Sequence, residues 1–297
     1  MAVSAKQMTD LPPAGEATLT VPGSEPPSLW VWLVIVLFVA LYAPTMVWLW
    51  DRWTLNVWQD AYGLMILPVA CYLIWQELWD TKHIPRSSSA WGFAILVPAL
   101  ILQILDTGMN TQLLSAFSLI LMLPGLSLLL LGVQKTRSIL FPLLFLFFTL
   151  PIPLALTDPL HLLLREIATG ITANVIPRFG IPLYVEGFTL HTPRGSLLVA
   201  DACSGFATLY ASLAIACLTA YLCPDWGRRI LVIALAAPIA IAANIIRIVL
   251  LVVLVDWYGM EILGTSWHTT TGLLTFAIAL PVIFWLGHTR SSPEAQS

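Results

Sequence analysis

The sequence predicts an all-α integral membrane protein with about eight transmembrane helices, and three observations lead to this fold class. First, the 297 residues are 59% hydrophobic and only 10% charged, which is too little polar surface to cover a water-soluble globule. Second, several of the 13 Trp residues stand near the ends of apolar runs, where the headgroup layer favours the amphipathic indole ring. Third, apolar stretches long enough to cross about 30 Å of hydrocarbon recur along the chain.

Eight such stretches form the expected membrane domain, residues 29–290, and no soluble domain interrupts them. The first 28 residues are rich in Pro, Ala, Gly and Thr, so we expect a disordered tail and no cleaved signal peptide. Residues 291–297 form a second tail. The expected spans are 29–50, 58–78, 90–106, 112–132, 138–156, 202–222, 230–255 and 267–287.

Basic residues in the short loops predict the orientation, because Lys and Arg are retained on the cytoplasmic side. The loops that follow the even-numbered spans hold Lys82, Arg86, Lys135, Arg137, Arg228, Arg229 and Arg290. The opposite short loops hold only Arg52. Both termini are therefore expected in the cytoplasm, and the starts of the sixth and eighth spans on the outer face. The net charge of −3 is weak and predicts no nucleic-acid partner.

The connection 157–201 is much longer than the others and is expected outside the membrane. Residues 161–176 carry apolar side chains at helical spacing, which predicts an interfacial amphipathic helix. Residues 181–200 alternate in part around a turn at 192–195, which indicates a β-hairpin. Three polar side chains of this hairpin are candidates to line a substrate groove, although solvated surface charges explain them as well: Glu186, His191 and Arg194.

Cys203 is the cysteine that the predicted topology places at the outer end of a span. Cys71 and Cys217 fall inside helices, and Cys223 lies about 30 Å along the same helix, far beyond the ~7 Å limit for a disulfide. An exposed thiol in an oxidising compartment is a liability unless it has a use. The alternative is a small apolar residue packed at a helix start.

Two further groups are expected at the same outer leaflet. Arg247 stands in an apolar segment, where a guanidinium costs several kcal/mol unless it is paired or faces a wet cavity, and Asn244 shares its helical face. His268 begins the eighth span. Thiol, guanidinium and imidazole are the groups that a nucleophile, an anion stabiliser and an acid/base require. A structural hydrogen-bonding cluster, a snorkelling Arg and an interfacial His are the alternatives.

Other enzyme classes find little support in the motifs of this chain. No His/Glu pair has metal-ligand spacing, no Gly-rich loop could cradle a phosphate, and no Gly-x-Ser-x-Gly segment occurs. We therefore expect no metal and no cofactor.

Several segments, taken in order, resemble the exosortase/archaeosortase family of membrane cysteine transpeptidase-like enzymes. They are the run that ends in Pro151-Ile-Pro153, Gly180-Ile-Pro182, Glu186-Gly187, Ala202-Cys203-Ser204-Gly205, Asn244-Ile-Ile-Arg247, and His268 with Gly272. The resemblance implies that Cys203, Arg247 and His268 are catalytic, with Asp201, Ser204, Gly205 and Asn244 supporting them. Asp201 and the Phe206-Ala-Thr that follows the Gly depart from the common pattern of Glu and a basic residue, which bears on subfamily and substrate motif.

The resemblance also implies the substrates: exported proteins that end in a Pro-Glu-Pro-like motif, a membrane helix and a basic tail. It implies a bacterial inner-membrane location, with cleavage through a Cys203 thioester on the outer face. Two alternatives stay open. A transporter or lipid-handling protein could use Arg247 and Asn244 to bind an anionic group, although the chain lacks the repeated halves common in transporters. A membrane scaffold would have no chemistry.

Overall fold

The computed structural model describes residues 29–55, 62–200, 203–264 and 267–288. The two expected tails, Asp201 and Arg290 lie outside these ranges. The chain divides into two compact units, residues 1–43 and 44–297, and helix α1 (Leu29–Leu55) crosses the boundary. Every candidate site residue belongs to the second unit.

Each predicted span overlaps a helix of the structure. The helices after α1 are α2 (Tyr62–Asp80), α3 (Trp91–Met109), α4 (Leu113–Ser138), α5 (Leu140–Phe145), η1 (Leu146–Thr149), α6 (Leu154–Val175), η2 (Ile176–Phe179), α7 (Phe206–Leu222), α8 (Trp226–Tyr258), η4 (Met260–Gly264) and α9 (Trp267–Gly287). Within the described ranges, four segments are long and apolar enough to cross a membrane: Trp32–Thr54, Trp91–Met109, Leu113–Ser138 and Trp226–Tyr258. The helical membrane fold is thus confirmed, while the count of eight spans remains a prediction.

The fifth predicted span, 138–156, is interrupted in the structure. Helix α5 ends at Phe145 and the short η1 that follows it ends at Thr149; Leu150 is extended, and α6 begins only at Leu154. Pro151 and Pro153 explain the break, because proline has no N–H to donate and biases the residue before it towards extended backbone. The expectation of one continuous span here is therefore wrong.

Helices α3 and α4 pack as an antiparallel hairpin with a polar turn. Asp106, near the end of α3, is 1% exposed and accepts hydrogen bonds from the hydroxyls of Thr111 and Ser115. Asn110 ends α3 in the left-handed conformation, and its N–H donates to the Asp106 carbonyl at 2.6 Å. The turn is therefore held by its own side chains.

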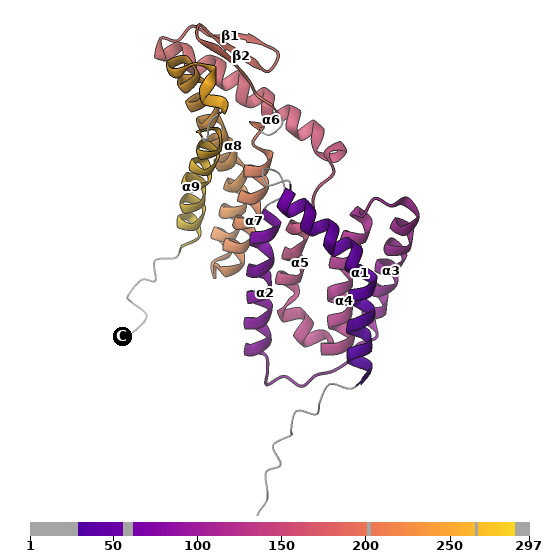
Figure 1. The fold of residues 1–297 in the computed structure, drawn as a ribbon. Helices are drawn as coiled ribbons and strands as arrows, with labels where there is room; N and C mark the ends of the chain where they lie inside the picture. The colour runs from indigo at the N-terminus through magenta and orange to yellow at the C-terminus, as the bar shows by residue number, and fades with distance from the viewer. Residues whose placement is uncertain (1–28, 56–61, 201–202, 265–266, 289–297) are drawn as a thin grey trace, which may run out of the picture. The chain divides into compact units, whose positions relative to one another are not determined.

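Helices α7, α8 and α9 run side by side (Figure 1). Small and branched side chains fill the core between them, namely Ala216, Val232, Ala236 and Ile283. Small residues let helix backbones approach closely in a membrane, where lipid gives no hydrophobic driving force for packing. This bundle positions the candidate site.

Three short antiparallel strands follow α6, in the order β1 (Tyr184–Glu186), β2 (Thr189–Thr192) and β3 (Gly195–Leu198). The expected single hairpin is therefore extended by a further strand. The sheet lies against α8 (Figure 1), and the Ser196 N–H contacts Met260 Sδ of η4 at 3.1 Å. Its inner side chains form one apolar cluster with α6 and α8, which includes Ala168, Leu190, Leu197, Val199, Cys203, Ile248 and Leu251.

Helix α6 overlaps the amphipathic helix expected at 161–176. It begins seven residues earlier than expected, at Leu154, and ends one residue earlier than expected, at Val175. Its buried side chains follow helical spacing, at Thr157, His161, Leu164, Ala168 and Thr172. The same helix exposes apolar side chains elsewhere, with Leu156 at 74%. The buried stripe of α6 faces α8 and the start of α7.

Candidate active site

Cys203 lies in the turn that delivers the chain from the sheet into α7. Its N–H donates to the Ala200 carbonyl at 2.8 Å, and Gly205 caps the helix two residues later. The side chain is only 5% exposed and packs in the apolar cluster with Val199 and Ile248. The expected exposed thiol is therefore wrong, because the sheet and α8 cover the start of α7.

Asn244 of α8 holds the Cys203 turn in place. Its Nδ2 donates to the carbonyl oxygens of Cys203 and Ser204, at 3.2 and 3.1 Å. Gly205 has φ +90°, and a Cβ added there would lie 2.5 Å from Asn244 Cγ. Both the backbone conformation and the close approach of Asn244 therefore require glycine at this position.

Arg247 lies one helical turn beyond Asn244 and is 9% exposed. It does not donate to Asn244 Oδ1, so the two residues share a face but are not bonded to each other. Among the described residues, neither Asn244 Oδ1 nor Arg247 Nε has a hydrogen-bond partner. A buried guanidinium N–H without a hydrogen-bond acceptor costs free energy unless a further group accepts its hydrogen bond.

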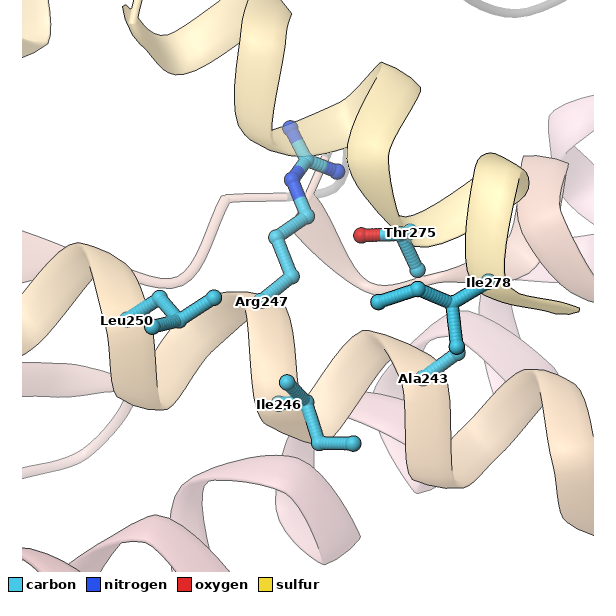
Figure 2. Close-up of a pocket in the computed structure, with 6 residues that line it drawn as sticks. All are labelled: Ala243, Ile246, Arg247, Leu250, Thr275 and Ile278. Carbon is cyan, nitrogen blue, oxygen red and sulfur yellow. The ribbon is translucent and has the colours of Figure 1, made fainter.

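The guanidinium points from α8 towards α9 (Figure 2). A Cβ added to Gly272 would lie 3.6 Å from Arg247 Cζ, so the backbone of α9 borders the charge directly. Arg247 also lines a small pocket of about 10 Å³ between the two helices, with Ala243, Ile246, Leu250, Thr275 and Ile278. The Thr275 hydroxyl donates to the Thr271 carbonyl at 2.7 Å, which leaves Arg247 as the polar group that the pocket offers to a ligand.

Burial raises the pKa of the Cys203 thiol, and the nearby positive charge of Arg247 lowers the same pKa by a smaller amount. The net direction is upward, so the resting site holds a neutral thiol. Attack on a carbonyl requires the thiolate, and a base must therefore remove the proton during the reaction.

The structure describes only the backbone of His268, and Asp201 lies outside the described residues. His268 belongs to the first turn of α9, four residues before Gly272, which puts position 268 on the helical face that borders Arg247. Its side chain lies outside the described residues, as does Asp201 as a whole. Their functional roles remain predictions.

The three polar residues of the sheet are not gathered at Cys203 by any described contact. Glu186 Oε2 lies 3.7 Å from His191 Nε2, an ion-pair spacing that is too long for a hydrogen bond. Arg194 Nη1 donates to the Trp257 carbonyl at 3.0 Å and so ties the turn between β2 and β3 to the last residues of α8. Arg194 thus has a structural contact of its own, and a substrate role for the three remains a prediction.

His161 of α6 is the residue that the sequence did not single out. Its Nδ1 lies 2.8 Å from Ser204 Oγ, and the two side chains are 7% and 1% exposed. One signal could have found it: His161 precedes Leu164 and Ala168 on the buried stripe of an amphipathic helix, where a polar residue needs a partner.

The fold and this site define a polytopic helical membrane protein that holds a buried cysteine and a buried arginine where its helices meet. The family model of the transmembrane exosortases (Exosortase_EpsH) matches residues 50–285, which include all of these side chains, and the chain belongs to this family. The resemblance read from the motifs is thereby confirmed. Family membership makes the chain a membrane sorting enzyme of a cysteine transpeptidase-like kind. No curated protein and no solved structure matches the chain.

Proposed function

We propose that the chain is a cysteine peptidase or transpeptidase that cleaves the C-terminal sorting signal of exported proteins through a thioester at Cys203. The observation that carries the proposal is the position of Cys203 at the start of α7, close enough to Arg247 for the charge to act on its thiol. Family membership supports a sorting enzyme in general. The proposed substrates end in a Pro-Glu-Pro-like motif, a membrane helix and a basic tail.

The proposed reaction begins when Cys203 Sγ attacks the carbonyl carbon of the scissile peptide bond. The thiol proton passes to His268, and the carbonyl oxygen becomes an oxyanion beside Arg247. Collapse of this intermediate breaks the C–N bond, His268 returns the proton to the leaving amine, and the C-terminal segment departs. Water or an acceptor nucleophile then resolves the thioester and restores the thiol.

The contacts of α8 favour different roles for its two polar residues. Asn244 Nδ2 already serves two backbone carbonyls, so Asn244 is assigned to positioning the turn that carries Cys203. Arg247 Nε has no partner among the described residues, which favours Arg247 as the group that meets a developing negative charge. Asp201, Ser204 and Gly205 would support the same turn.

The charge distribution supports an outer-face site. Arg228 and Arg229 lie at the start of α8, whereas Cys203 precedes the opposite end of α7, a helix of 17 residues or about 25 Å. Because basic residues stay in the cytoplasm, Cys203 is assigned to the outer side of a bacterial inner membrane, with eight spans and both termini inside. Glu186, His191 and Arg194 would then meet the polar motif of the substrate.

The alternative of a transporter or lipid-handling protein also relies on Arg247. The pocket beside this residue has a volume of about 10 Å³, far below the about 300–1,000 Å³ of typical small-molecule sites. A reacting peptide group needs far less room than a whole lipid or solute. The small size of the pocket therefore argues against a bound lipid or solute.

Co-expression with a reporter that ends in a Pro-Glu-Pro motif, an apolar helix and Arg residues tests the proposal. The wild-type enzyme should shorten the reporter, as measured by its mass. Cys203→Ala should abolish shortening while the enzyme still accumulates in the membrane. The matched control is Cys217→Ala, a cysteine within α7 that should process normally. Continued shortening by Cys203→Ala would contradict the proposal.

A further inference from the structure

The turn that carries Cys203 is held from two directions by side chains of two different helices. Asn244 of α8 binds its backbone carbonyls, as described above. His161 of α6 binds its side chain instead, with Nδ1 2.8 Å from Ser204 Oγ. The residue next to the candidate nucleophile is thus the meeting point of α6, α7 and α8.

The Ser204 hydroxyl has a defined set of partners. Its oxygen accepts a hydrogen bond from the Phe206 N–H at 3.3 Å, in the first turn of α7, and it exchanges a second hydrogen bond with the imidazole. A hydroxyl can donate one hydrogen bond and accept two, so both contacts can form together. The hydroxyl therefore couples the His161 ring to the backbone where α7 begins.

The surrounding packing also restricts the orientation of the His161 imidazole. His161 is 7% exposed, and its ring centroid lies 4.7 Å from that of Phe206. A buried polar ring costs free energy unless it is hydrogen-bonded, and Ser204 supplies that bond. The ring consequently has little freedom to turn away from Ser204.

We propose that His161 is a positioning residue for the candidate nucleophile: through Ser204 it fixes the turn that presents Cys203, separately from the acid/base role assigned to His268. The inference rests on the proposed function for its catalytic readout. Because a displacement of about 1 Å at a reacting group costs up to about 10²-fold in rate, a loosened turn should slow catalysis without weakening substrate binding.

Steady-state processing of a sorting-signal peptide by full-length enzyme in membranes tests the inference. His161→Ala should lower kcat by about 10- to 100-fold and leave KM within about twofold. His161→Asn should recover most of the loss, because its amide reaches about as far as Nδ1 and can bond to the same hydroxyl. His83→Ala, at an exposed histidine in the α2–α3 connection, is the matched control and should behave as wild type.

A double-mutant cycle that combines His161 and Ser204 substitutions tests the same contact, and its His161→Asn arm remains usable if His161→Ala fails to fold. Since the two side chains act through one contact, the combination of His161→Asn or His161→Ala with Ser204→Ala should be no slower than Ser204→Ala alone. Multiplied losses, a normal kcat for His161→Ala, or no recovery by His161→Asn would each overturn it.

A readout without substrate separates this inference from the proposed function. The rate at which a small maleimide alkylates Cys203 should change at least about threefold in His161→Ala and return towards the wild-type rate in His161→Asn. If Cys203→Ala still processes the reporter while these alkylation rates change as expected, the function is wrong and the positioning contact is right. If Cys203→Ala is inactive but His161→Ala leaves both the alkylation rate and kcat unchanged, the positioning role of His161 is wrong and the proposed function stands.

Discussion

Two buried polar clusters of this membrane protein differ in how their hydrogen bonds are completed. In the turn between α3 and α4, both carboxylate oxygens of Asp106 accept from hydroxyls, one from Thr111 and one from Ser115. At the Cys203 turn, by contrast, Asn244 Oδ1 and Arg247 Nε are buried without a partner among the described residues.

The difference is consistent with a structural role for the Asp106 cluster and with the proposed chemical role of the Cys203 turn. A satisfied cluster stabilises its own turn and offers nothing to a ligand. A buried donor without a partner costs about 1–3 kcal/mol, a cost that a bound group can remove. Sites where local rules are broken are often functional sites. The Asp106 turn is therefore assigned to the fold, while the Cys203 turn remains the proposed active site.

Among the tests of this comparison, the largest loss of activity is expected from Arg247→Lys. A guanidinium offers a planar fork of donors and stays charged when partly desolvated, whereas a buried ammonium is a single point whose pKa falls. Loss of one well-placed oxyanion donor typically costs about 10²–10³ in turnover, so reporter processing should fall at least about tenfold. Arg137→Lys, at an exposed position near the end of α4, should process normally. Near-native turnover of Arg247→Lys would show that only positive charge is needed.

Gly205→Ala should have the next largest effect, on both stability and processing. The left-handed backbone costs a non-glycine residue about 1–3 kcal/mol, and the contact with Asn244 adds about 1–3 kcal/mol of overpacking. Gly180→Ala is the matched control, since Gly180 has φ +80° and open space around its added Cβ. Thermal unfolding measures both variants. Equal losses would show that Asn244 does not constrain the turn.

Cys203 alkylation should be slow and strongly dependent on pH. Burial raises the pKa of its thiol, so its thiolate fraction stays below that of an exposed cysteine throughout the neutral range. The alkylation rate should rise about tenfold per pH unit beyond pH 8.5, where the rate at an exposed thiol levels off. Tyr184→Cys, at a 67% exposed position of β1, provides that reference. Matching profiles for the two cysteines would contradict the buried site.

Asp106→Ala should have the smallest effect on processing. The substitution leaves the hydroxyls of Thr111 and Ser115 without their acceptor, which should lower the free energy of unfolding by about 1–3 kcal/mol. Turnover per folded enzyme should stay within about twofold of wild type, because the turn lies in a different helical hairpin. A specific loss of turnover would mean that the two clusters are coupled.

The sequence predicted the helical membrane fold well because its main signal, the length of apolar runs, acts locally. It predicted the break at Leu150–Pro153 badly, since an apolar run continues across Pro151 and Pro153 and masks their effect on the backbone. Motif resemblance placed Cys203, Asn244 and Arg247 in one site, and the structure brings the first two into hydrogen-bond contact.

The sequence could not predict what covers the site. The burial of Cys203 depends on the sheet just before it and on α8, whose Ile248 and Leu251 are more than 40 residues away in sequence. The contact between His161 and Ser204 joins residues 43 positions apart, and no local pattern pairs them. Such contacts follow from the tertiary packing of α6. The amphipathic spacing shows which face of α6 is buried, but not which helix or turn packs against that face.

The burial of Cys203 also has a consequence for the lifetime of the enzyme. Oxidation of a cysteine to sulfenic or sulfinic acid depends on its thiolate fraction and on its exposure. Cys203 is only 5% exposed, and burial raises the pKa of its thiol. In the proposed orientation Cys203 faces an oxidising compartment, and we expect its burial to slow oxidation of the sulfur between substrates. The fold itself would then protect the proposed nucleophile.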